Sequence, residues 1–191
     1  MEKKKINEKA IVDAALNSFS EKGIDKTSIR DIMEGSGLGL GTFYLYFSDK
    51  KSLEEKIVLD ILTNLIYQAE MQCIGDNASD RYISFVSYII DELLNRPLDL
   101  DLISRNANWA LYAKIENDHR FEEADNTLKF ILSRFDSLFN VKLSESEKLF
   151  IISITFNIVI STCKYSLNDD CVLTIDEMKP IIYKIIEKIF R

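Results

Sequence analysis

Apolar residues recur at the spacing of an α-helix along most of this chain. In residues 6–23, for example, Ile11, Ala15 and Phe19 fall near one helical face, and Gly23 follows as a residue that readily ends a helix. The same pattern, bounded by capping residues and glycines, predicts further helices at 28–35, 41–47, 50–73, 79–96, 98–117, 120–139, 144–166 and 176–191. No segment shows the alternation of a strand, and only 2 prolines and 6 glycines interrupt the 191 residues. The sequence therefore predicts an all-α fold of about nine helices.

Short polar motifs mark where several of these helices begin. Thr27 or Ser28 can cap the second helix, and Asp49 can cap the fourth. Ser144 and Glu147 have the spacing of a capping box, in which each residue satisfies a backbone N–H of the other. These motifs predict helix starts that do not depend on the hydrophobic pattern.

Charge is distributed unevenly along the chain. The formal net charge is −7, which by itself disfavours a nucleic-acid partner. Residues 1–56, however, carry equal numbers of basic and acidic side chains, so the whole negative excess lies in residues 57–191. The overall acidity therefore does not exclude an anion-binding surface in the first third of the chain.

Cysteine usage and hydropathy predict a reduced, cytoplasmic protein. Cys73, Cys163 and Cys171 show neither a CxxC spacing nor an even count. The N-terminus is charged but lacks the apolar segment of a signal peptide. The longest apolar run, 149–160, is broken by polar residues and is shorter than the roughly 20 residues that a membrane helix needs. We therefore expect a buried core helix there and no membrane partner.

Four of the six glycines lie within residues 35–41, just before an aromatic stretch that ends at Phe47. A phosphate-binding loop is excluded, because the spacing matches neither the dinucleotide fingerprint nor the P-loop and a helix precedes the cluster. Two short helices around a glycine-containing turn instead match a helix-turn-helix, with Gly37 at the turn and Leu38 between the helices. The third helix would then face DNA. The spacing alone leaves open an unspecific turn between two core helices.

A resemblance to the TetR family of transcriptional regulators covers residues 10–53, AIVDAALNSFSEKGIDKTSIRDIMEGSGLGLGTFYLYFSDKKSL. The matching motifs are AAxxxFxxxG in the first helix, TSxRDI in the second, GTFYxYF in the third and FxxKxxL at the start of the fourth. The resemblance implies a helix-turn-helix DNA-binding domain over residues 5–65, with the motif itself at about 28–47. It also implies a ligand-sensing and dimerisation domain over residues 66–191.

Carried over residue by residue, the resemblance implies DNA contacts from the starts of the second, third and fourth helices. The implied residues are Thr27, Ser28, Gly41, Thr42, Tyr44, Tyr46 and Lys50. Phe43 and Phe47 are expected in the core. The family often has polar residues where this chain has Gly39-Leu40 and Leu45, so we expect support from an N-terminal arm, Lys3–Lys5, and from apolar base contacts. The expected partner is a pseudo-palindromic double-stranded DNA operator.

Reactive side chains show no catalytic or metal-binding arrangement. His119 is the only histidine, and neither a Ser-His-Asp triad nor a paired-carboxylate motif is visible. The acidic segment 168–170 lacks the glycine and glutamate of a calcium loop. Cys163 and Cys171 are more simply explained as small apolar residues than as a redox switch. We expect neither an enzyme nor a metal site nor a cofactor.

The last two helices predict a homodimer. The helix over residues 147–166 is apolar on nearly all sides. A helix on the surface of a single chain has a polar outer face, so this helix is expected to be covered on both sides. In the final helix, Ile181 and Ile185 form one stripe, with Ile182 and Ile186 beside it. The family resemblance also implies that such helices form half of an intermolecular four-helix bundle. The alternative is that both helices simply fill the core of the monomer.

The second half of the chain carries more aromatic residues than a helical core of its size needs. Apolar walls with a few orienting polar groups are typical of a small-molecule site between helices. The expected lining residues are Phe85, Tyr88, Asn108, Trp109, Tyr112, Phe130, Phe156 and Asn157. The alternative is that these aromatics are plain core.

These observations predict a DNA-binding transcriptional regulator, most simply a repressor that a small, largely apolar ligand releases from its operator. The alternative is a helical small-molecule-binding or protein-interaction module whose helix-turn-helix does not bind an operator. The sequence identifies neither the ligand nor the operator.

Overall fold

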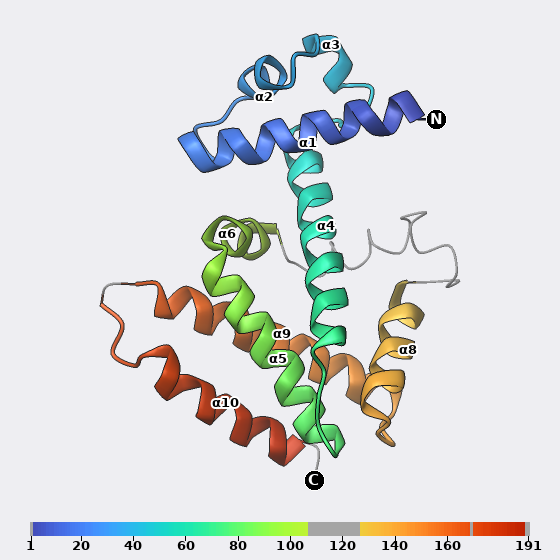
Figure 1. Cartoon of the computed structure of the whole chain (residues 1–191), viewed down its shortest axis with the longest axis vertical. Helices are drawn as coiled ribbons and strands as arrows, with labels where there is room; N and C mark the ends of the chain where they lie inside the picture. The colour runs from blue at the N-terminus through green and yellow to red at the C-terminus, as the bar shows by residue number, and fades with distance from the viewer. Residues whose placement is uncertain (1, 107–126, 169, 190–191) are drawn as a thin grey trace. The chain divides into compact units, whose positions relative to one another are not determined.

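Nine helices and no strand make up the residues that the computed structural model describes, 2–106, 127–168 and 170–189 (Figure 1). In chain order the helices are α1 (Glu2–Lys22), α2 (Ile29–Ser36), α3 (Leu40–Phe43), α4 (Lys50–Met71), α5 (Ala78–Asn95), α6 (Pro97–Asn106), α8 (Thr127–Phe139), α9 (Glu145–Ser166) and α10 (Ile175–Ile189). The all-α prediction is confirmed.

The chain divides into two compact units, Met1–Asp60 and Ile61–Arg191, and the division falls inside α4. Unit 1 holds α1, α2, α3 and the first half of α4. Its core is formed by apolar side chains from all four helices, namely Ile11, Ala15, Phe19, Ile32, Phe43, Phe47, Leu53 and Ile57. The domain boundary expected after residue 65 stays a prediction.

Local signals in unit 1 produce the turns that the sequence predicts. Gly23 follows α1 with a φ of +84°, and Gly37 follows α2 with a φ of +69°. Both residues occupy the left-handed region that glycine reaches without steric cost. Ser28 caps α2 through a capping box with Asp31. Helix α4 is capped by Asp49, whose carboxylate accepts a hydrogen bond from the Ser52 N–H at 2.7 Å.

Two elements of unit 1 differ from the prediction. Helix α1 already begins at Glu2, so Lys4 and Lys5 are exposed residues of a helix and not part of an extended arm. Helix α3 is regular only over Leu40–Phe43 and continues as turns to Phe47. Its N-cap, Gly39, offers no side-chain hydrogen bond, and aromatic and β-branched residues follow, so local propensity supports only a short helix.

Unit 2 is built around α5, which contacts α6, α8, α9 and α10. The buried face of α5 carries Tyr82, whose hydroxyl donates a hydrogen bond to the Thr155 hydroxyl of α9 at 3.0 Å. Burial raises the pKa of Tyr82 to about 12. Arg81 lies beside it and donates to the backbone carbonyls of Leu138 and Phe139 at the end of α8. Polar contacts as well as apolar packing therefore join the helices of this unit.

Helix α9 is only partly buried. Its inward stripe consists of Lys148, Ile151, Thr155, Val159 and Cys163. Phe150 and Ile154 are exposed, so within a single chain the expected burial is found only along that stripe. Within the described residues, α9 alone is long and apolar enough to cross a membrane by length and composition, although only 22% of that stretch is buried. The core helix of a soluble protein can have the same length and apolar composition. Burial in the core does not account for the exposed apolar side chains of α9, however.

Candidate nucleic-acid interface and ligand-binding region

The segment that begins with α3 has one buried face and one exposed face. Phe43 and Phe47 are 0% and 7% exposed and anchor the segment to unit 1, as predicted. Leu40, Tyr44 and Leu45 are 44%, 59% and 74% exposed. Residues four apart on a helix share a face, so Leu40 and Tyr44 lie together on the outward side. Two leucines and a tyrosine on a small surface element indicate a binding face and not a buried turn.

Gly41 lies between these exposed side chains. A Cβ atom added to Gly41 would meet nothing within 4 Å, so packing within the protein does not require a glycine here. Because Gly41 has no Cβ atom, its backbone is open to close approach by another molecule. Thr42 and Tyr46, which flank this face, are half-buried.

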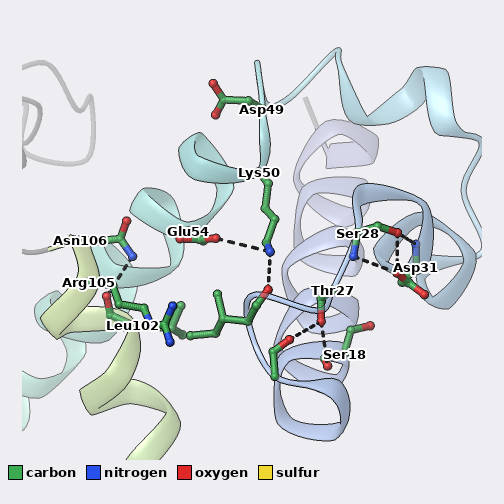
Figure 2. Close-up of polar contacts among 12 residues, drawn as sticks. Ser18, Thr27, Ser28, Asp31, Asp49, Lys50, Glu54, Leu102, Arg105 and Asn106 are labelled. Atoms are coloured by element: carbon green, nitrogen blue, oxygen red, sulfur yellow. Dashed lines mark hydrogen bonds and ion pairs between the residues drawn. The ribbon is translucent and has the colours of Figure 1, made fainter.

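Thr27 and Ser28 are engaged by their own unit (Figure 2). Thr27 is 2% exposed, and its hydroxyl lies 2.8 Å from the Gly23 carbonyl and 3.1 Å from the Ser18 carbonyl, both of which accept from it. The Ser28 hydroxyl donates to the Asp31 carboxylate and accepts from the Asp31 N–H. A hydroxyl has one proton to donate. The side chains of Thr27 and Ser28 therefore build the start of α2 and are not poised to donate to DNA.

Lys50 is likewise turned toward the protein. Its ammonium group donates to the carbonyl of Ile24 in the loop before α2 and lies 4.0 Å from the Glu54 carboxylate (Figure 2). The same group stands 5.6 Å from the centre of the Phe19 ring, within the range of a cation–π contact. The first turn of α4 is thereby tied to α1 and to the α1–α2 loop. The Lys50 ammonium group, which the resemblance places among the DNA contacts, is thus held by groups of unit 1.

The start of α2 also carries an ion pair. Lys22, at the end of α1, lies 2.5 Å from the Asp31 carboxylate. Hydrogen bonds from Lys22 and from Ser28 hold the pKa of Asp31 well below its ordinary value. Asp31 therefore stays charged through the physiological range and holds α2 against α1.

Exposed cations that the sequence interpretation did not select lie near the helix-turn-helix. Lys26 precedes α2, Arg30 lies in its first turn and Lys51 follows Lys50 in α4. All three are exposed, and among the described residues none of them forms an ion pair. Their charge and their position at helix starts could have identified them.

Four of the eight residues predicted to line a ligand site have described side chains, namely Phe85, Tyr88, Phe156 and Asn157. Asn108, Trp109 and Tyr112 lie outside the described residues, as does the side chain of Phe130. Phe85 stacks on Tyr82 at 6.3 Å between ring centres and belongs to an aromatic cluster with Phe139. Phe85 is half-buried and packs against the buried rings of Tyr82 and Phe139.

Two further predicted lining residues are on α9. Phe156 is half-buried. Asn157 is exposed, and its amide donates to the Ser153 carbonyl at 2.8 Å, so its placement gives no support to a role inside a pocket of one chain.

An open groove of about 470 Å³ lies on unit 2 against α5 and α10. Of the predicted ligand residues whose side chains are described, Tyr88 alone lines it. The groove is lined by Gln72, Ile74, Asp80, Ile83, Ser84, Ser87, Tyr88 and Tyr183. The Tyr183 hydroxyl donates to the Ser87 hydroxyl at 2.8 Å and closes one side. The lining mixes isoleucine side chains and hydroxyls with the Gln72 amide and the Asp80 carboxylate.

Helix α10 presents two different apolar faces. Ile182 and Ile186 are buried against the rest of unit 2, whereas Ile181 and Ile185 are 51% and 43% exposed.

Within the described residues, no group of three or more His, Cys, Asp or Glu side chains could hold a metal ion. His119 lies outside them.

Comparison with known proteins places this geometry in a family. The family model described as bacterial regulatory proteins, tetR family, matches residues 11–57. The chain is 30% identical over 140 residues to the HTH-type transcriptional regulator YvdT of Bacillus subtilis, an alignment that covers 72% of this chain and 67% of YvdT. IcaR of Staphylococcus aureus, the negative transcriptional regulator of the biofilm operon icaADBC, is 39% identical over 59 residues, or 29% of this chain and 32% of IcaR.

The fold is also found among solved structures. The transcriptional regulator FadR of Bacillus subtilis, in complex with stearoyl-CoA, matches with a TM-score of 0.58 and 18% identity over 95% of this chain and 96% of FadR. At this identity the likeness shows the fold alone. Together with the helix-turn-helix geometry and the likeness to YvdT, it shows that this chain belongs to the TetR family of bacterial transcriptional regulators.

Proposed function

We propose that the chain is a cytoplasmic, dimeric repressor that a small apolar ligand releases from a pseudo-palindromic operator. The exposed face of α3 carries this proposal: Leu40, Tyr44 and Leu45 face outward over a core of Phe43 and Phe47. IcaR is a negative regulator and FadR was solved with stearoyl-CoA, which supports repression and an apolar effector for this chain.

The proposed DNA contacts come from the α3 segment and from nearby cations. Gly41, Thr42, Tyr44 and Tyr46 would meet the major groove with backbone, hydroxyl and ring contacts. The exposed cations Lys26, Arg30 and Lys51 would meet phosphates. Thr27, Ser28 and Lys50 would act indirectly, because their polar groups hold the helix starts in place.

Release of the operator would follow from coupling between two sites. A dimer presents two α3 segments to successive major grooves, about 34–36 Å apart. A ligand that binds unit 2 better in one helix arrangement shifts the dimer toward that arrangement. If the arrangement spaces the two α3 segments wrongly, operator affinity falls by the same factor by which DNA weakens ligand binding.

DNA binding is tested with the duplex immediately upstream of the coding sequence, measured by fluorescence anisotropy at several salt concentrations. Thr42→Ala and Tyr44→Ala should weaken binding while the helical circular dichroism stays that of the parent. Tyr67→Ala is the matched control, because Tyr67 is a half-exposed tyrosine of α4 in unit 2. Unchanged affinity in both α3 variants would contradict the proposed interface.

Ligand response is tested through Trp109, the only tryptophan of the chain. A screen of fatty acids and aromatic compounds should find some that change Trp109 emission saturably and release the duplex over the same concentrations. Trp109→Phe keeps an aromatic ring and removes the signal. Compounds that release the duplex without changing Trp109 emission, and that act normally on Trp109→Phe, would place the ligand site elsewhere.

A further inference from the structure

The base-reading segment of this protein has an unusual chemical inventory. Residues 35–48, which run from the end of α2 to the start of the loop before α4, contain no charged side chain, no asparagine, no glutamine and no histidine. Guanine is read most often by arginine or lysine, adenine by asparagine or glutamine, and cytosine by carboxylates. The segment offers none of these groups. Its side-chain donors are hydroxyls only, from Ser36, Thr42, Tyr44, Tyr46 and Ser48.

The most prominent outward side chains of residues 35–47 are two leucines and one tyrosine, and the exposed Ser48 follows them. Leu45 is 74% exposed and Leu40 44%, whereas Thr42 is only half-exposed and Ser36 donates its hydroxyl to the Met33 carbonyl. Tyr44 is 59% exposed and edge-on to the buried ring of Phe43, at 5.4 Å between ring centres. The exposed side chains of this segment are therefore largely apolar, and the buried Phe43 anchors them.

One base offers an apolar group at the major-groove edge. Thymine carries a 5-methyl group there, and leucine or an aromatic ring can cover it. A Cβ atom at Gly41 would meet nothing within 4 Å, so this position carries no side chain that would keep the neighbouring Leu40 away from the DNA. Burial of these side chains against methyl groups removes apolar surface from water on both partners.

We propose that Leu40, Tyr44 and Leu45 read thymine 5-methyl groups, so that each half-site is specified by the position of its thymines. This inference rests on the proposed function, because it names how the same surface would select an operator. It predicts a specificity that depends on methyl groups and not on hydrogen bonds to guanine.

The test uses duplexes recovered from a randomised library by in vitro selection with the purified full chain. Each thymine in the recovered duplex is replaced in turn by deoxyuridine, which lacks only the methyl group. We expect replacement at one or more positions in each half-site to weaken binding of the parent about fourfold per methyl group, the equivalent of one buried apolar carbon.

A double-mutant cycle assigns the effect to a side chain. Leu45→Ala should bind the thymine duplex more weakly than the parent does. At the thymine that Leu45 reads, replacement by deoxyuridine should then cause no further loss of affinity in this variant. Leu167→Ala is the matched control, because Leu167 is a half-exposed leucine of unit 2, and it should behave as the parent does. Circular dichroism and thermal melting of Leu45→Ala should match the parent, since the residue is exposed.

The outcomes separate this inference from the function on which it rests. If selected duplexes bind tightly but deoxyuridine changes nothing, thymine reading is refuted and the DNA-binding function stands. If Leu45→Ala weakens both duplexes and leaves the deoxyuridine effect intact, Leu45 does not read the methyl group. If no duplex is recovered, the proposed function itself fails.

Discussion

The polar side chains of Thr27, Ser28 and Lys50 form hydrogen bonds within the helix-turn-helix unit itself. Each lies at a position where the resemblance implies a DNA contact, and each donates a hydrogen bond to a group of unit 1 instead. An unsatisfied buried carbonyl costs about 1–3 kcal/mol, so a nearby hydroxyl or ammonium group is drawn inward. At the residue scale, we therefore expect the affinity for DNA to depend on other side chains.

Lys50 and Lys51 are neighbours in sequence and should behave oppositely. Lys50→Met removes a hydrogen bond to the Ile24 carbonyl and a cation–π contact, so we expect a loss of about 1–2 kcal/mol of unfolding free energy. The dependence of DNA affinity on salt should stay that of the parent. Urea unfolding and salt-dependent anisotropy measure the two quantities.

Lys51→Met is the control for that experiment. Because Lys51 is exposed, its substitution should leave stability unchanged, weaken DNA binding and lower the salt slope by about 1. A fall in the salt slope for Lys50→Met instead would show that Lys50 leaves the Ile24 carbonyl to meet a phosphate.

Two glycines of the turn region should respond differently to alanine. Gly41→Ala introduces a Cβ into open space within a helix, so the unfolding free energy should rise by up to about 1 kcal/mol while DNA affinity falls. Gly37→Ala forces alanine into a left-handed conformation and should cost about 1–2 kcal/mol. Thermal melting followed by circular dichroism, together with anisotropy, measures both. Undiminished DNA affinity in Gly41→Ala would argue against close backbone approach.

At the scale of the elements, carboxylates at helix starts hold the fold together. Asp31 joins α2 to α1 through Lys22, and Glu147 closes the capping box of α9 with Ser144. Hydrogen bonds lower the pKa of both carboxyl groups below their unfolded values. The unfolded chain therefore takes up protons more readily than the folded chain as the pH falls.

We expect stability to be lost on acidification. The contribution of these carboxylates is fully present above the unfolded pKa values of about 4 and disappears as the pH falls below them toward the folded values. Urea unfolding at pH 7, 5, 4 and 3.5 should show the fall, and Asp31→Asn should be less stable at pH 7 but lose less on acidification. Asp76→Asn, in an exposed loop, should follow the parent. An equal acid loss in Asp31→Asn and the parent would remove Asp31 from the explanation.

At the scale of the whole molecule, we expect the exposed faces of α9 and α10 to pack against a partner. Phe150, Ile154, Ile181 and Ile185 are apolar and exposed, and a large apolar patch on a soluble protein marks an interaction site. A second copy of the chain is the partner that the family implies. The same faces account for the apolar character of α9 without a membrane.

Introduction of a charge should therefore dissociate the dimer. We expect light scattering to give about twice 22.1 kDa for the parent at micromolar concentration and close to 22.1 kDa for the double variant Ile181→Glu/Ile185→Glu. Gln68→Glu adds a single charge at an exposed residue of α4 and should remain a dimer. A parent that scatters as a monomer, or a double variant that stays dimeric, would place the interface elsewhere.

Features that depend on neighbouring residues could be read from the sequence. The turns at Gly23 and Gly37, the caps at Ser28 and Ser144, and the anchors Phe43 and Phe47 are all found as predicted. The dense motifs of residues 10–53 identified the family for the same reason, since helix, turn and helix follow within one short stretch. Aromatic residues in unit 2 were less informative, because core packing and a ligand site use the same side chains.

The sequence by itself determined the all-α class, the helix-turn-helix and its chemical inventory, because these follow from spacing and residue type. Only the tertiary structure decided that the Lys50 ammonium group turns to the Ile24 carbonyl, that Thr27 is buried and that Phe150 faces outward. Each of these outcomes depends on groups from different elements that meet in space. Periodicity along a chain says which residues share a face, whereas only packing decides what that face meets.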